Sequence, residues 1–164
     1  MILRERRDVL RGIGLILPMG TTGCLGLTTQ DSIEIEYQVW GPTTEIQTEV
    51  SEDLAEELLE AVGREAETWV VVDVDMQSGE IESGDLFRGT HVEANGYIGS
   101  MVGVYAHSPT PEEIITSSDE NYSLFEGARA DLYYHIAHPV EQAEWVTRGL
   151  EGEFDSITLV DRTA

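Results

Sequence analysis

A run of consecutive apolar residues in the middle of the chain does most to limit its possible folds. Residues 68–76 read Thr-Trp-Val-Val-Val-Asp-Val-Asp-Met, so the start of the run is apolar on both faces, as in the central strand of a sheet. Residues 32–40 alternate polar and apolar side chains, which predicts a strand with one buried face. Asn95-Gly96 separates two strand-like runs and is a strong signal of a β-hairpin. Further strands are predicted in residues 44–50, 86–94, 97–105, around 132–134 and in 154–160.

One segment has a helical period. Leucine and valine recur at helical spacing in residues 51–62, and acidic residues occupy the other face. Ser51 is a suitable N-cap and Gly63 a suitable C-terminal stop. Residues 77–85 and 108–122 are predicted to be loops. Residues 140–148 fit either one helical turn or an irregular segment. The whole pattern predicts a mainly all-β fold, an antiparallel β-sandwich into which one short acidic helix is inserted.

The N-terminus combines an arginine pair, a short apolar stretch and a cysteine. Arg6-Arg7 precede residues 9–19, an apolar stretch that is interrupted by Arg11, two glycines and Pro18. A transmembrane helix needs about 20 apolar residues, so this stretch is too short to span a membrane and is typical of the h-region of a signal peptide. The sequence Thr-Thr-Gly-Cys follows and ends at Cys24, the only cysteine of the chain. The order and spacing predict an export signal that ends at this residue.

This arrangement resembles a twin-arginine signal followed by a lipobox, as found in exported lipoproteins. The resemblance implies that residues 1–23 are a twin-arginine lipoprotein signal peptide, which depends on Arg6 and Arg7 and is cleaved before Cys24. Cys24 would then carry a lipid with two chains, because a single chain gives only marginal membrane binding. Residues 24–32 would be the lipidated cysteine and a polar tether, and residues 33–164 a single domain. The expected location is the extracellular face of the cell membrane, to which the protein is lipid-anchored.

Acidic side chains dominate the composition. The 164 residues include 32 acidic residues, 9 arginines and no lysine, which gives a formal net charge of −23. Such a charge opposes compaction at low salt, whereas at about 1 M salt the Debye length falls to about 3 Å and the repulsion is screened. The chain thus resembles proteins of extreme halophiles, and with its export signal it resembles haloarchaeal lipoproteins. The charge argues against nucleic acid as a partner, because phosphate binding needs lysine and arginine.

The order of the strand motifs resembles a family of domains. A Trp-Val-Val-Val-Asp-Val strand at residues 69–74 is followed by Leu-Phe-Glu-Gly-Ala-Arg-Ala-Asp-Leu-Tyr-Tyr at residues 124–134, and then by a strand with Ile157, Leu159 and Val160. This order is similar to that of the telokin-like, immunoglobulin-type domain of secreted microbial lipoproteins. The resemblance covers roughly residues 33–161 and implies an immunoglobulin-like β-sandwich. Because the family has no general catalytic motif, the resemblance implies no active site.

Two pairs of polar residues are candidates for chemistry. His135 and His138 have the spacing of metal ligands on a helix, but their surroundings predict a strand, where positions three apart point to opposite faces. Asp73 and Asp75 share a strand face and could bind calcium or act as acid and base. In so acidic a chain they also fit a solvated sheet face, which is the interpretation that we favour. No motif of a serine hydrolase, dinucleotide site, phosphate loop or zinc protease occurs. The sequence therefore predicts no catalytic, cofactor-binding or metal-binding residue.

Taken together, the sequence predicts a membrane-anchored extracellular lipoprotein with a non-enzymatic, immunoglobulin-like interaction or accessory domain. Its partners would be the membrane, through lipid on Cys24, and an unidentified protein at the cell surface. The alternative is a lipoprotein that binds a small ligand or cation for a transporter, and a hydrolase is a third hypothesis. An interaction domain should expose an apolar patch rimmed by acids, and a ligand-binding protein should hold a deep apolar pocket. A hydrolase should bring His135 or His138 to a carboxylate and a nucleophile.

Overall fold

The computed structural model describes residues 32–44, 52–62, 68–108, 113–116 and 122–163. The predicted export signal, with Arg6, Arg7 and Cys24, lies outside these residues, as does nearly all of the predicted strand 44–50. The described elements are β1 Ser32–Thr43, α2 Glu52–Val62, β2 Thr68–Ser78, β3 Glu80–Glu82, α3 Ser83–Gly89, β4 His91–Ala94, β5 Tyr97–Ser108, β6 Glu113–Ile115, β7 Ser123–Phe125, β8 Arg129–Ile136, β9 Glu144–Val146, the 3₁₀ turn η1 Arg148–Leu150 and β10 Ser156–Asp161.

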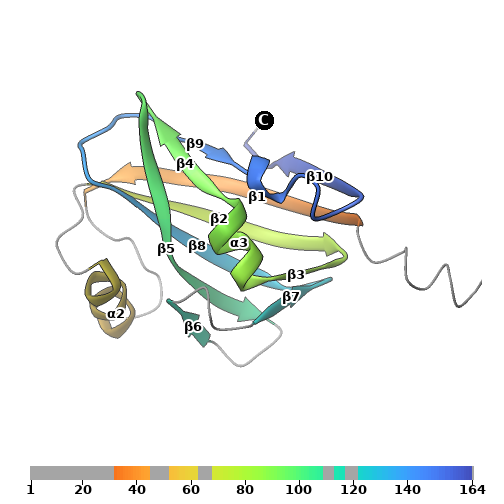
Figure 1. Cartoon of the computed structure of the whole chain (residues 1–164). Coiled ribbons are helices and arrows are strands. Elements are labelled where there is room, and N and C mark those ends of the chain that lie inside the picture. Colours follow the sequence, from red (N-terminus) through yellow and green to blue (C-terminus); the bar gives the residue numbers. More distant parts are fainter. Residues whose placement is uncertain (1–31, 45–51, 63–67, 109–112, 117–121, 164) are drawn as a thin grey trace, which may run out of the picture. The chain divides into compact units, whose positions relative to one another are not determined.

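Most strands belong to one eight-stranded sheet (Figure 1). Its strand order is β10-β1-β2-β8-β5-β4-β9, with β6 paired to β5 beside this path, and β3 and β7 form a separate two-stranded sheet. Neighbouring strands are antiparallel except for β1 and β10, which run parallel. The apolar run at residues 68–76 forms β2, which has a neighbour on each side, as its sequence predicts.

Both faces of β2 are covered by other side chains. Val70, Val72 and Val74 are at most 1% exposed and belong to the main hydrophobic core. Trp69 points to the other face and packs with Leu58 of α2 in a smaller cluster. We name the sheet face with the main core the inner face, and the one that packs with α2 the outer face. The acidic helix is therefore confirmed, and its buried leucine explains its helical period.

The sheet curls around the main core. Trp145 of β9, at one end of the strand order, contacts Tyr37 of β1, near the other end, and their ring centroids are 5.0 Å apart. This contact brings the inner faces of distant strands onto the same core. The fold is thus mainly β and sandwich-like, as predicted, with α2 inserted between β1 and β2.

A chain of buried hydrogen bonds links three elements inside the main core. Trp145 Nε1 donates to the Tyr134 hydroxyl at 2.8 Å, and this hydroxyl lies 2.6 Å from Thr90 Oγ1. Thr90 Oγ1 donates its one proton to the Leu86 carbonyl at 2.7 Å, so Tyr134 must donate to Thr90. Burial raises the pKa of Tyr134, and the two hydrogen bonds only partly oppose it. These hydrogen bonds join β9, β8 and α3, and each of the three side chains has a hydrogen-bond partner, as buried polar groups require.

Residues 77–94 differ most from the sequence-based prediction. The sequence predicts a turn-rich connection and then a strand, whereas the chain forms β3, the helix α3 and the short strand β4. Adjacent apolar residues such as Leu86 and Phe87 do not distinguish a buried helix from a strand. The helix packs tightly on η1, since a Cβ added to Gly89 would lie 2.3 Å from Leu150 Cδ2. This contact, distant in sequence, favours the helix over the predicted strand.

The other predicted connections are partly confirmed. Asn95 and Gly96 have positive φ angles of 52° and 85° and form the predicted hairpin turn between β4 and β5. The predicted loop 108–122 contains the short strand β6, and the ambiguous segment 140–148 contains β9. The predicted closing strand is present as β10, but it runs parallel to β1 and not antiparallel.

Candidate functional site

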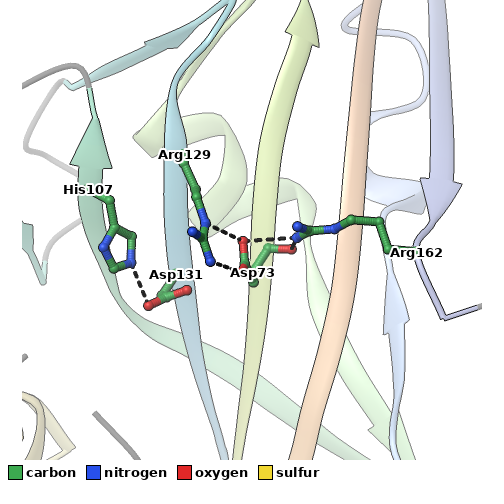
Figure 2. Close-up of polar contacts among 5 residues, drawn as sticks. All are labelled: Asp73, His107, Arg129, Asp131 and Arg162. Carbon is green, nitrogen blue, oxygen red and sulfur yellow. Dashed lines mark hydrogen bonds and ion pairs between the residues drawn. The ribbon is translucent and has the colours of Figure 1, made fainter. Parts of the chain in front are cut away.

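The outer face carries a cluster of charged residues around Asp73 of β2 (Figure 2). Arg129 of β8 donates two hydrogen bonds to the Asp73 carboxylate, at 2.6 Å to Oδ2 and 3.2 Å to Oδ1. On the other side, Arg162 Nη2 lies 2.9 Å from Oδ1. The Asp73 side chain is only 7% exposed. Its charge is therefore largely removed from water and is balanced by two guanidinium groups.

The strand register explains how these residues meet. Asp73 pairs directly with Asp131 of β8, and Arg129 lies two residues earlier on the same face, diagonal to Asp73. Arg162 follows β10 and approaches from beyond β1, as Figure 2 shows. Its backbone N–H donates to the Tyr37 carbonyl at 2.9 Å, and its side chain donates to the Asp73 carbonyl at 3.1 Å. The cluster thus fastens the end of β10 to the central strand β2.

Two opposing effects set the pKa of Asp73. Burial raises it, but the hydrogen bonds and charges of Arg129 and Arg162 outweigh burial and hold the pKa below its ordinary value of 3.8. Asp73 is therefore ionised at neutral pH and is a poor proton donor. Two of the four arginines in the described residues are used on this one carboxylate, the others being Arg88 and Arg148. Such a use of scarce cations indicates a structural role.

A second polar pair lies beside this cluster. His107 Nε2 of β5 is 2.7 Å from Asp131 Oδ2, and the two side chains are about one quarter and one fifth exposed. Burial raises the pKa of Asp131, and the hydrogen bond from His107 only partly counteracts it. The ring of Tyr105 meets His107 edge-on, with centroids 4.7 Å apart. A carboxylate can orient an imidazole for proton transfer, but the described contacts of this pair include no serine, threonine or cysteine nucleophile.

The predicted histidine pair does not converge on one site. The His135 ring lies edge-on to Trp69 at 6.3 Å, whereas the His138 ring stacks on Tyr97 at 4.0 Å. Both rings therefore contact aromatic side chains. In the residues that the structure describes, no three His, Cys, Asp or Glu side chains come together as a metal site. The two rings are therefore in different surroundings, but His138 lies beyond the end of β8 at Ile136, so the predicted alternation along one strand does not apply to it.

The predicted aspartate pair has a different outcome. Asp73 and Asp75 do share the outer face of β2. The favoured interpretation as a solvated face is wrong for Asp73, which is 5% exposed and bound by two arginines. The sequence did not predict this cluster because Arg129 of β8 and Arg162, which follows β10, are both distant from Asp73 in sequence. Their scarcity in an acidic, lysine-free chain is the signal that could have drawn attention to them.

Exposed apolar side chains gather at the tip of the β4–β5 hairpin. Tyr97 is 42% and Ile98 is 67% exposed, and Tyr97 is the ring that stacks on His138. Ile98 is paired in register with Glu93 of β4. The tip is therefore a small apolar surface with an acidic residue beside it.

A second exposed apolar surface lies at β10, beside a hollow of about 380 Å³. The hollow is lined in part by Phe154, Ile157 and Leu159. Ile157 and Leu159 are paired in register with the buried residues Ile33 and Ile35, so all four point to the inner face. Leu159 is nonetheless 36% exposed. The apolar inner surface thus reaches the edge of the sheet and is left open there.

Comparisons of the chain with protein-family models, with curated proteins and with solved structures gave no match. Among the residues that the structure describes, no helix has the length and apolar character needed to cross a membrane. The fold and its surfaces define the chain as a mainly β, sandwich-like domain with a structural charge cluster and an open apolar edge.

Proposed function

We propose that this chain is an exported lipoprotein whose β-sandwich domain is held at the outer face of the cell membrane by lipid on Cys24, where it binds another protein without catalysing a reaction. The order of Arg6-Arg7, a short apolar stretch and the only cysteine supports export and anchoring. The net charge of −23 supports a high-salt environment, in which the repulsion between carboxylates is screened.

The observation that carries the binding function is the contrast between a filled interior and an open edge. Val72, Leu132 and Tyr134 on the inner face are all 0% exposed, so the domain's own side chains occupy the main core. At β10, by contrast, the inward-facing Leu159 is 36% exposed beside the hollow. An open apolar surface of this kind favours contact with a partner. The domain thus has room for a partner at the sheet edge and little within its core.

The polar residues of the outer face support the non-enzymatic part of the proposal. Both oxygens of the Asp73 carboxylate are bound by arginines, which leaves it unsuited to bind a cation or to exchange a proton. Asp131 and His107 bind each other. These groups therefore act as contacts within the fold.

Cell fractionation tests the export and the anchor. The full chain would be expressed in a haloarchaeal host as wild type, as Cys24→Ser and as the double variant Arg6→Lys, Arg7→Lys. We expect wild type in the membrane fraction and accessible to external protease, Cys24→Ser in the medium, and the arginine variant inside the cell. Retention of all three forms in the cytoplasm would show that the export interpretation is wrong.

The binding function needs a separate measurement. Wild-type membranes would be dissolved in mild detergent at high salt, and the native size of the complex would be measured by sedimentation. Leu159→Lys should reduce the protein to its monomer size, whereas Ile98→Lys, the same change at the exposed hairpin tip, should leave the complex intact. A wild-type protein that sediments as a monomer would contradict the binding function, even if the anchor is confirmed.

A further inference from the structure

Among the strands that the structure describes, β10 lies at an edge of the sheet and leaves one of its own edges unpaired. β10 is the first strand in the sheet order, and within the described residues it pairs only with β1. A strand in this position presents backbone N–H and C=O groups that can pair with another chain. The opposite edge of the sheet, β9, has only three residues and begins with Glu144, which makes it a poor template.

β10 lacks the features that usually protect a strand edge. Residues 156–160 read Ser-Ile-Thr-Leu-Val, with no charged residue and no proline, although a quarter of the chain is charged. Edge strands in natural proteins are commonly protected by charges, proline, bulges or short length. β10 is six residues long, and its register with β1 is continuous over six pairs. Its edge is therefore regular, carries no charge before the terminal Asp161, and is long enough to pair with another strand.

The hollow beside β10 supplies a pocket for side chains. Because Ile157 and Leu159 point to the inner face, a strand added outside β10 would direct alternate side chains toward Phe154 and the hollow. Its volume of about 380 Å³ is near the lower end of the range of about 300–1,000 Å³ for ligand pockets. The charged residues that line it, Glu151 and Asp155, are both acidic.

We propose that β10 binds an extended peptide segment of a partner protein by strand addition, with an apolar side chain in the hollow and a basic residue beside Glu151 and Asp155. Main-chain hydrogen bonds would give affinity, and the hollow would select the side chain, as in other cases of strand addition. Charge complementarity favours a basic partner segment. A second copy of this chain would instead bring acidic rims together. The inference rests on the proposed binding function and specifies its partner.

A peptide titration tests the mode of binding. The probe is a fluorescent peptide, Arg-Thr-Val-Thr-Leu-Thr-Arg, titrated with the full chain carrying Cys24→Ser and followed by anisotropy. Two further peptides have methyl groups on the amide nitrogens of one edge or of the other, so that one of them loses the hydrogen bonds to β10, and a fourth has glutamates in place of both arginines. Loss of two main-chain hydrogen bonds should weaken binding by about tenfold or more. The glutamate peptide should bind more weakly than the first peptide, and this difference should be larger at low salt. Equal affinity of the unmethylated peptide and of both methylated peptides, or no binding of the first peptide, would overturn the proposal.

Protein variants locate the site. Leu159→Lys should weaken binding of the first peptide by at least about tenfold, whereas Ile98→Lys should leave it unchanged. Thermal unfolding of each variant tests its fold, and Leu159→Thr replaces Leu159→Lys if the lysine variant does not fold. Equal peptide affinity of wild type and the folded Leu159 variant would overturn the site. If wild type is a dimer and Leu159→Lys dissociates it, β10 binds a second copy of the chain, and the proposed peptide site is wrong. Failure here with a confirmed membrane complex would reject strand addition and leave the proposed function in place.

Discussion

The hydrogen-bond chain through Tyr134 gives the sharpest prediction about stability. Tyr134→Phe removes one fully buried hydroxyl and leaves Trp145 Nε1, which donates to it at 2.8 Å, without its acceptor. An unsatisfied buried donor costs about 1–3 kcal/mol, and the lost hydrogen bond to Thr90 costs about 1 kcal/mol more. We therefore expect the free energy of unfolding to fall by about 2–4 kcal/mol, a large part of the 5–15 kcal/mol typical of such a domain.

Urea unfolding at constant high salt, followed by tryptophan fluorescence, measures this loss. Thr90→Val keeps the side-chain shape but removes the acceptor of the Tyr134 proton and the donor to Leu86. The double variant should lose about 1 kcal/mol less than the sum of the single variants, because both remove the same hydrogen bond. Tyr97→Phe is the matched control, since this residue is 42% exposed and belongs to neither hydrophobic cluster.

Two results would refute this reasoning. One is an unchanged unfolding midpoint for Tyr134→Phe at an unchanged denaturant slope, which would mean that the buried hydroxyl contributes nothing net. The other is strict additivity of Tyr134→Phe and Thr90→Val, which would mean that the two hydroxyls are not coupled. A loss in Tyr97→Phe as large as that in Tyr134→Phe would show that the effect does not depend on burial.

Four further predictions follow from burial and charge. Burial raises the folded-state pKa of Tyr134, so stability should fall as pH rises above 10.0, where the unfolded chain ionises first. Tyr134→Phe should show a smaller fall in urea midpoints than wild type; part of the fall should remain, because the pKa of Tyr37 is raised as well. Asp73→Asn should lower the free energy of unfolding by about 1–3 kcal/mol. In wild type, the ionised Asp73 stabilises the fold fully above pH 3.8, and this stabilisation is lost as pH falls through the lowered folded-state pKa; acid unfolding should show that the variant lacks this part of the pH dependence. The pKa of Asp131 is raised, so wild-type stability should increase as pH falls from neutral through that pKa toward 3.8, and Asp131→Asn should lack the increase in thermal midpoints. Gly149→Ala should cost about 1–3 kcal/mol by overpacking, measured by urea unfolding, because its Cβ would lie 2.7 Å from Gly89 Cα.

Local patterns predicted the elements whose structure depends on neighbours in sequence. Three predictions of this kind are confirmed: the apolar run of β2, the hairpin turn at Asn95-Gly96 and the helical period of α2. In each case the local sequence fits only one backbone conformation. α3 was missed because Leu86 is buried equally well by a helix or a strand, and only the contact with η1 distinguishes them. The parallel direction of β10 depends on pairing with β1, more than a hundred residues away, which no local pattern records.

The charged residues show the same limit. Their spacing on β2 correctly placed Asp73 and Asp75 on one face, because strand geometry alone determines it. Whether such a carboxylate lies in water or beneath two guanidinium groups depends on which strands flank it. That information is held in the register with β8 and in the path of Arg162 over β1, and neither is visible from a single segment.

The parallel pairing of β1 and β10 has a mechanical consequence. β1 begins at Ser32, the last residue of the proposed tether, and it is paired over six positions with β10 and over most of its length with β2. A pull along β1 from Ser32 would therefore load both ladders in shear, so that many hydrogen bonds must break together. The ion pair between Arg162 and Asp73 adds resistance to separation of the strands, because it links the end of β10 to β2 on the other side of β1. If the domain hangs from its N-terminus as we propose, this arrangement would help it keep its fold under tension.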